Sequence, residues 1–210
     1  TVRRYSQEAA AFLVSRGVKA VVIACNTATA HAGEVLARTL PVPVLGVIEP
    51  GARAAVAATR TGRIGVIGTA GTIGSGAYDL AVRRKLDNAR LYAQPCPLFV
   101  PLVEEGWLHD DATRMVAARY LRPLQEMDVD VLILGCTHYP LMRPLLSDLM
   151  GPAVTLVDSA EETAREVGER LGSEGLLRTL DSPPAYTFVA SDSPLRFRDV
   201  GRRFVGDILQ

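Results

Sequence analysis

The sequence has 210 residues, of which 48% are hydrophobic and 22% charged, and its 23 basic and 23 acidic side chains cancel to a formal net charge of zero. This length can bury the core of one large domain or two small ones, and the lack of a basic excess argues against nucleic acid as a partner. No apolar run is long enough to span a bilayer. Three cysteines without CxxC spacing argue against a disulfide framework or a zinc site, so we expect no membrane association and a reducing, cytoplasmic location.

In chain order, the apolar periodicity predicts helices that alternate with buried strands. The first helix covers Val2–Arg16 and ends at Gly17, and the first strand follows at Val18–Ala24. Such alternation is typical of parallel α/β sheets covered by helices. We predict further strands at 44–48, 63–68, 91–95, 131–134, 154–157 and 186–190, and further helices at 26–40, 52–59, 75–86, 110–127, 141–150, 160–171 and 192–206.

The same pattern of strand and thiol occurs twice. The apolar run Val131–Leu134 stops at Gly135 and is followed directly by Cys-Thr-His, and the earlier run Ala20–Ala24 is followed directly by Cys-Asn-Thr. The carboxyl ends of parallel strands are where ligand crevices form in open α/β sheets. A single such cysteine is most simply a small buried side chain. Two of them favour an internal duplication that places Cys25 and Cys136 in a shared cleft.

Three other polar segments have simple structural interpretations. The segment Thr69–Thr72 offers hydroxyls and backbone N–H groups to an anion, although an ordinary turn from strand to helix is the better explanation. Glu104 and Glu105 follow an irregular apolar segment, Cys96–Val103, and one of these carboxylates can point inward while most such pairs are solvated. The arginines of the helix at 192–206 are best interpreted as a solvated face.

Two facing thiols suit a reaction that is itself nearly symmetric. In racemisation at a carbon next to a carboxylate, one thiolate removes the α-proton from one face and the other thiol delivers a proton to the opposite face. The sequence contains no binding motif for a metal or an electron-sink cofactor. His138 can assist Cys136 as an acid or base, and Asn26, Thr27 and Thr137 can donate hydrogen bonds to a substrate carboxylate.

Several of these segments resemble the glutamate racemases of the aspartate/glutamate racemase superfamily. The segments that carry the resemblance are Ala24–Ala28 (ACNTA), Gly46–Gly51 (GVIEPG), Cys96–Gly106 (CPLFVPLVEEG), Gly135–Leu141 (GCTHYPL) and Asp158–Ala160 (DSA). The resemblance implies two pseudo-symmetric parallel-sheet α/β domains with the active site in the cleft between them. It places residues 1–49 with 163–210 in the first domain and 50–162 in the second.

The resemblance also implies the chemistry and the roles of individual residues. Cys25 and Cys136 match the two catalytic thiols, one serving each enantiomer of glutamate, and Cys96 stays structural. His138 matches the residue that supports the second catalytic thiol, here Cys136. Glu104 matches a carboxylate that is implicated near the second half-reaction. Asn26, Thr27, Thr137 and His138 match substrate-contacting positions. The family works without a cofactor, makes D-glutamate for peptidoglycan and often forms homodimers.

The family pattern has two features that this sequence lacks. Members begin with a strand that leads into Asp-Ser-Gly-x-Gly-Gly, and they carry Tyr-Gly before the helix found here at residues 2–16. A doubly wound unit also normally begins with a strand rather than a helix. We therefore expect an N-terminal piece of the first domain to be missing from this chain.

Other functions remain open at this stage. Aspartate racemase, hydantoin racemase and maleate isomerase reuse paired cysteines, although the segments around Cys136 and Glu104 favour glutamate. A racemase-like fragment that only binds an acidic ligand needs neither thiol. A thiol-redox protein would instead form a reversible disulfide between Cys25 and Cys136.

Overall fold

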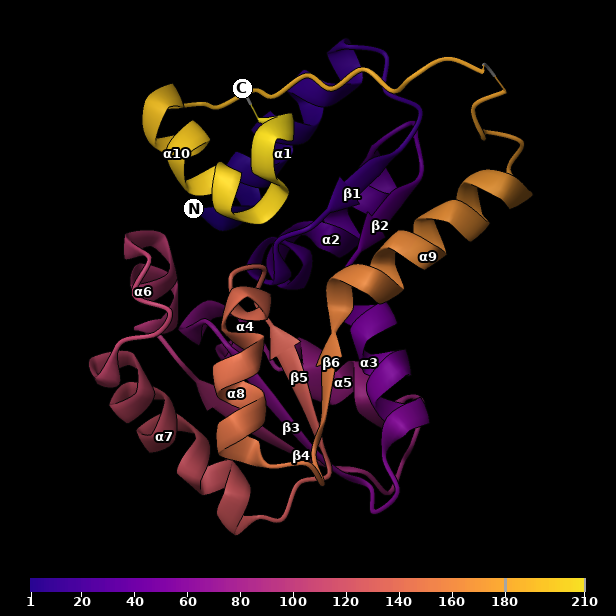
Figure 1. Ribbon diagram of the computed structural model, residues 1–210. Coiled ribbons are helices and arrows are strands. Elements are labelled where there is room, and N and C mark those ends of the chain that lie inside the picture. The colour runs from indigo at the N-terminus through magenta and orange to yellow at the C-terminus, as the bar shows by residue number, and fades with distance from the viewer. Residues whose placement is uncertain (180, 210) are drawn as a thin grey trace. The chain divides into compact units, whose positions relative to one another are not determined.

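The computed structural model describes residues 1–179 and 181–209 and consists of two compact units, residues 1–176 and 177–210. The larger unit alternates helices and strands, as Figure 1 shows. Its strands are β1 (Val21–Ile23), β2 (Val44–Gly46), β3 (Arg63–Gly68), β4 (Arg90–Pro95), β5 (Val131–Gly135) and β6 (Thr155–Asp158). Its helices are α1 (Val2–Ser15), α2 (Asn26–Thr39), α3 (Ile48–Ala58), α4 (Ala70–Gly74), α5 (Ala77–Arg83), α6 (Phe99–Glu105), α7 (Asp111–Glu126), the 3₁₀ turn η1 (Tyr139–Met142), α8 (Arg143–Met150) and α9 (Ser159–Ser173).

The strands form two parallel sheets. β1 pairs with β2 in one sheet, and the other has the order β4-β3-β5-β6 with every neighbouring pair parallel. This confirms the predicted α/β class with parallel sheets, because helices complete the crossovers that parallel neighbours require. The predicted domain boundaries at 49/50 and 162/163 stay a prediction.

β5 is buried on both faces and organises the larger sheet. Its five residues are all buried, and it runs in register with β3 from Ile64 opposite Val131 to Gly68 opposite Gly135. Alternate side chains enter different cores. Val131 and Ile133 pack with residues of α3 and α5, whereas Leu132 and Leu134 pack with residues of α6, α7 and α8. Each such side chain contributes about 1.5–3 kcal/mol by burial, which fixes where the strand ends.

Two polar segments predicted as loop or irregular structure are helical. The segment Thr69–Thr72 leads into α4, and the Thr69 hydroxyl caps it by accepting a hydrogen bond from the Thr72 N–H at 3.2 Å. The segment after Cys96 forms α6, which ends at Gly106 in the left-handed region with φ of 82°. The prediction failed because local composition does not reveal the packing that stabilises short helices. Phe99 and Val103 supply that packing in α6.

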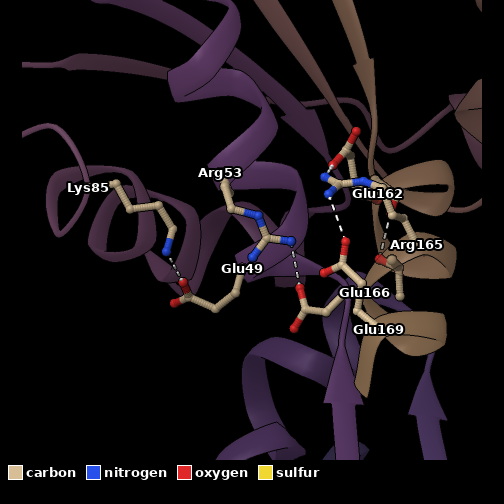
Figure 2. Close-up of polar contacts among 9 residues, drawn as sticks. Glu49, Arg53, Lys85, Glu162, Arg165, Glu166 and Glu169 are labelled. Carbon is tan, nitrogen blue, oxygen red and sulfur yellow. Dashed lines mark hydrogen bonds and ion pairs between the residues drawn. The ribbon is translucent and has the colours of Figure 1, made fainter. Parts of the chain in front are cut away.

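The predicted turn at residues 49–51 lies instead within the first turn of α3. Pro50 is tolerated there because the first N–H groups of a helix have no partner inside the helix. α3 packs beside α9, where Figure 2 shows Arg53 of α3 donating to Glu166 of α9 at 2.8 Å. Both side chains are partly exposed, so this ion pair contributes little to stability, and the register of the two helices depends on their apolar contacts.

The smaller unit, residues 177–210, contains α10 (Pro194–Val205) and the 3₁₀ turn η2 (Gly206–Ile208). The helix predicted at 192–206 is confirmed. The strand predicted at Tyr186–Ala190 is wrong, because no strand pairs with this segment in the described part of the chain. An apolar alternation forms a strand only where an edge is available to hydrogen-bond with it. None of the described helices is both long and apolar enough to cross a membrane.

Asp130 stabilises the end of the sheet opposite the strand-end thiols. Its carboxylate accepts hydrogen bonds from the Thr59 hydroxyl at 2.6 Å and from the backbone N–H groups of Arg60 at 2.6 Å and Thr61 at 2.8 Å. Burial alone would raise the pKa of this carboxyl, but these hydrogen bonds lower it below its ordinary value. The ionised carboxylate therefore connects the loop after α3 to the start of β5.

We expect Asp130→Ala to lower the free energy of unfolding by roughly 2–3 kcal/mol, because the substitution removes the charged acceptor of two backbone N–H groups and of the Thr59 hydroxyl. At about 2–4 °C per kcal/mol, the midpoint of thermal unfolding should fall by about 4–12 °C. Because the folded-state pKa is depressed, the contribution is present above the unfolded pKa and is lost as the pH falls through the folded pKa. Calorimetry of both proteins at several acidic pH values measures this.

Asp148→Ala is the matched control, because Asp148 is an exposed carboxylate paired with Arg114. Its removal should cost no more than about 1 kcal/mol. Equal losses of stability in the two variants would contradict the role given to Asp130.

Candidate active site

Cys25 lies at the junction of β1 and α2. It is the residue that precedes the first turn of α2, its backbone is extended, and its side chain is exposed. Asn26 and Thr27 begin the helix. The thiol therefore stands beside a helix N-terminus.

Cys136 follows the end of β5 and is 7% exposed. Burial raises the pKa of its thiol to about 11, although N–H groups of His138 and Tyr139 and the hydroxyl of Thr137 favour the thiolate. Charge on Cys25 raises the same pKa further. Cys136 is therefore a thiol at neutral pH, and the two cysteines are close enough to oppose each other's ionisation.

A cavity of about 430 Å³ lies at the ends of the two sheets, beside Cys136. Its lining comes from β1, from the segment after β5 and from α9, and most of it is apolar. The lining residues are Val22, Ala24, Val47, Cys136, Thr137, Pro140, Asp158, Ser159, Ala160, Thr163, Ala164 and Val167. Polar atoms here act in a region of low dielectric, where hydrogen bonds and charges are stronger than in water.

His138 and Glu104 stand behind Cys136. Nε2 of His138 lies 3.2 Å from Oε1 of Glu104, and its Nδ1 lies 4.0 Å from Sγ of Cys136 and 3.3 Å from the Thr137 hydroxyl. A carboxylate only accepts hydrogen bonds, so Nε2 donates to Glu104 and Nδ1 faces the thiol. The structure thus brings the helix α6 carboxylate to the Cys136 side, with Glu104 as the inward-facing member of the Glu-Glu pair and Glu105 exposed.

Three threonine hydroxyls cluster beside Cys25. Oγ1 of Thr27 lies 2.8 Å from Oγ1 of Thr69 and 2.9 Å from Oγ1 of Thr72, and the last two are 3.1 Å apart. A Cβ added at Gly71 would lie 2.9 Å from Cγ2 of Thr27, so only glycine permits this approach of α4 to α2. Sequence reasoning found the hydroxyls of Thr69–Thr72 but not their meeting with Thr27, which requires the pairing of two helix N-termini from different sheets.

Asn26 is 2% exposed, and its amide is held by a residue that sequence reasoning missed. The Tyr78 hydroxyl, from α5, donates to Oδ1 of Asn26 at 2.7 Å. Nδ2 of Asn26 is buried and has no partner in the structure. No motif distinguishes Tyr78 from an ordinary core tyrosine in the sequence.

The predicted site residues thus fall into two groups. Cys136, Thr137 and Glu104 each contact His138, and Asn26 and Thr27 lie beside Cys25 at the start of α2. Cys96 is fully buried, and burial raises the pKa of its thiol, as expected for a structural cysteine. In the described residues, no three His, Cys, Asp or Glu side chains cluster in a way that could hold a metal ion.

Comparison with known proteins places this arrangement in a family. Residues 3–167 match the family described as Asp/Glu/hydantoin racemase. The chain belongs to this racemase family. It is 52% identical over 206 residues to a glutamate racemase from Geobacter metallireducens, covering 98% of this chain and 76% of that protein.

Solved racemase structures share the fold. A glutamate racemase isoform from Bacillus anthracis superposes with a TM-score of 0.93 at 38% identity, covering 98% of this chain and 77% of that one. A Francisella tularensis glutamate racemase in complex with D-glutamate superposes with a TM-score of 0.92 at 34% identity, covering 100% and 78%. The predicted family is therefore confirmed, and this racemase-family chain spans about three quarters of the length of these relatives.

We expect the three cysteines to react with iodoacetamide at very different rates. Exposed Cys25 should react readily, and fully buried Cys96 should stay unmodified in the native protein. Because its pKa is about 11, Cys136 should react slowly near pH 7, and its rate should rise about tenfold per pH unit as the thiolate forms. Peptide mass spectrometry after timed alkylation from pH 7 to 10 measures all three. Equal rates for Cys25 and Cys136 at pH 7 would contradict the raised pKa.

Proposed function

We propose that the chain interconverts L-glutamate and D-glutamate by proton transfer at Cα, with Cys25 and Cys136 as the two bases on opposite faces of the carbon. The observation that carries this proposal is the pair of strand-end thiols, of which Cys136 lines the cavity and Cys25 is exposed, in a chain 52% identical to a glutamate racemase. The D-glutamate complex of the Francisella relative supports glutamate as the substrate.

The different burial of the two cysteines fits the number of protons that the reaction needs. A two-base turnover begins with one thiolate and one thiol, and each transfer exchanges their roles. Two adjacent thiolates would repel each other, and the buried Cys136 already holds its proton at neutral pH. In the direction that starts with proton removal by Cys25, Cys136 is ready to donate to the opposite face. In the reverse direction, Nδ1 of His138 can take the Cys136 proton, so that the Cys136 thiolate removes the α-proton while the Cys25 thiol donates to the opposite face. His138 then releases its proton to solvent, and the Cys25 thiolate takes one from solvent.

Amide and hydroxyl donors around the site suit a substrate with a carboxylate next to Cα. The α-proton of an amino acid is weakly acidic, so the negative charge that develops on its removal must be stabilised. Nδ2 of Asn26 and the hydroxyls of Thr27 and Thr137 are placed at the two strand ends to donate to this carboxylate. The Thr69 and Thr72 hydroxyls support Thr27 and extend the same donor surface.

We extend the proposal to the cellular role on the same resemblance. The product D-glutamate would supply peptidoglycan synthesis, and free thiols are maintained in a reducing cytoplasm. A homodimer is the assembly that the family resemblance favours, and sedimentation of the purified chain tests it.

The α-proton exchange experiment tests the main proposal. The chain is incubated with L-glutamate or D-glutamate in deuterated water, and proton NMR follows the α-signal while circular dichroism follows inversion. We expect loss of the signal from both enantiomers. Cys25→Ala and Cys136→Ala should each reduce inversion by at least about 10²–10⁴-fold, the usual contribution of one acid–base group. Any residual exchange should be confined to one enantiomer, opposite in the two variants.

Cys96→Ala is the matched control, because it removes a third thiol that is fully buried in the hydrophobic core, and it should keep inversion within a few-fold of the original. Exchange with L-aspartate in place of glutamate tests the substrate. Absence of exchange from either glutamate enantiomer, or full activity of both active-site cysteine variants, would refute the proposed function.

Glu104→Gln should slow the reaction on the Cys136 side alone. Loss of the carboxylate removes a charge-assisted hydrogen bond to His138, for an expected fall in kcat/KM of about 10–100-fold. Because the two enantiomers have equal free energy, this fall must be equal in both directions. The side affected is revealed by α-deuterated substrates, whose isotope effect should rise for the enantiomer that Cys136 deprotonates and fall for the other.

Glu105→Gln is its control, since Glu105 is the neighbouring exposed carboxylate of the same helix. It should leave both isotope effects unchanged. A symmetric response to Glu104→Gln would show that Glu104 acts on the site as a whole and not through Cys136.

A further inference from the structure

Tyr78 is a buried residue that contacts both halves of the site without lining its cavity. Its side chain is 3% exposed and comes from α5, outside the two strand-end motifs that carry the thiols. On the Cys25 side, its hydroxyl donates to Oδ1 of Asn26 at 2.7 Å. On the Cys136 side, its ring lies against Gly135, the residue that precedes the thiol.

Two glycines form the slot that holds the phenol ring. A Cβ at Gly135 would lie 3.2 Å from Cε2 of Tyr78, and a Cβ at Gly51 would lie 3.3 Å from its hydroxyl oxygen. A Cβ at Gly51 would also lie 3.1 Å from Cβ of Ser159, at the start of α9. The ring is thus fixed by the end of β5 and the starts of α3 and α9, and its hydroxyl has little freedom to turn away from Asn26.

The hydrogen bond to Asn26 determines which atom of the amide remains available. A side-chain amide offers one oxygen acceptor and two N–H donors. The Tyr78 hydroxyl donates to Oδ1 in this arrangement, whereas a reversed amide would donate from Nδ2 to the phenol oxygen and leave Oδ1, an acceptor, at the position that Nδ2 now occupies. Nδ2 is the atom left over, and it is buried without a partner. An unsatisfied buried donor costs about 1–3 kcal/mol, and a ligand acceptor at this position would remove that cost.

We propose that Tyr78 is a positioning residue that orients the Asn26 amide so that Nδ2 faces the substrate carboxylate beside Cys25. The inference rests on the proposed function, because it assigns Nδ2 a ligand of carboxylate chemistry. Its ring also contacts Gly135, at the end of the strand that leads to Cys136. Tyr78 therefore positions the Asn26 donor relative to the Cys136 thiol.

The test is a double-mutant cycle of Tyr78→Phe and Asn26→Ala. Tyr78→Phe keeps the ring in its slot and removes only the hydroxyl. We expect kcat/KM for both glutamate enantiomers to fall about 5–20-fold, the value of one hydrogen bond to a positioned donor. If Tyr78 acts through Asn26, the phenylalanine substitution should have no further effect once Asn26 is alanine. Additive losses, or an unchanged kcat/KM in Tyr78→Phe, would overturn the proposal.

Tyr139→Phe is the matched control. Tyr139 is also fully buried, and its hydroxyl donates to the Cys96 carbonyl at 3.0 Å. Both phenylalanine variants lose one buried hydrogen bond, so both should unfold at a lower temperature than the original chain. Only Tyr78→Phe should show the non-additive loss with Asn26→Ala. The same loss in Tyr139→Phe would mean that the effect is general destabilisation.

A second readout needs no activity. The side-chain amide resonances of Asn26, assigned by their disappearance in Asn26→Ala, should shift and broaden in Tyr78→Phe and stay unchanged in Tyr139→Phe. If the original chain exchanges no α-proton, the proposed function fails, and these resonances still decide whether Tyr78 orients the amide. Unchanged resonances in Tyr78→Phe would overturn the positioning role in either case.

Discussion

The parallel pairing of β5 with β3 is the constraint on which the rest of the structure depends. It buries every residue from Val131 to Gly135 and ends the strand opposite Gly68. The position of Cys136, directly after the strand, is therefore fixed, and the burial of its thiol keeps it protonated. A one-residue slip would exchange the two faces of the strand and move the thiol from the site. The position of the Cys136 thiol thus depends on apolar packing on both faces of β5.

The two halves of the site repeat a motif but differ in environment. Cys25 is exposed at the start of α2, whereas Cys136 is buried and supported by His138 and Glu104. A reaction between enantiomers of equal free energy does not require equal bases. It requires one thiol and one thiolate at each turnover, and burial keeps Cys136 in the thiol form at neutral pH.

Contacts between the halves come from residues that carry no motif. The hydroxyls of Thr69 and Thr72 reach Thr27 across the two sheets, and Tyr78 reaches Asn26. Glycine at position 71 permits the first contact, and the glycines at 51 and 135 form the slot for the second. Backbone closeness at these points places the donors with little side-chain freedom, which lowers the entropy cost of binding a substrate.

The sequence by itself determined the parallel α/β class, most strands and helices, and the paired thiols with His138, because apolar periodicity and strand-end motifs are local signals. It also led to the racemase family. Local signals failed for α4 and α6, whose helical form depends on packing, and for residues 186–190, which have no strand beside them in the described part of the chain. Only the tertiary structure decided which carboxylate faces Cys136, which hydroxyls meet Thr27 and what holds Asn26. These contacts join residues that are far apart in sequence, and local sequence patterns do not show which distant residues meet in the folded chain.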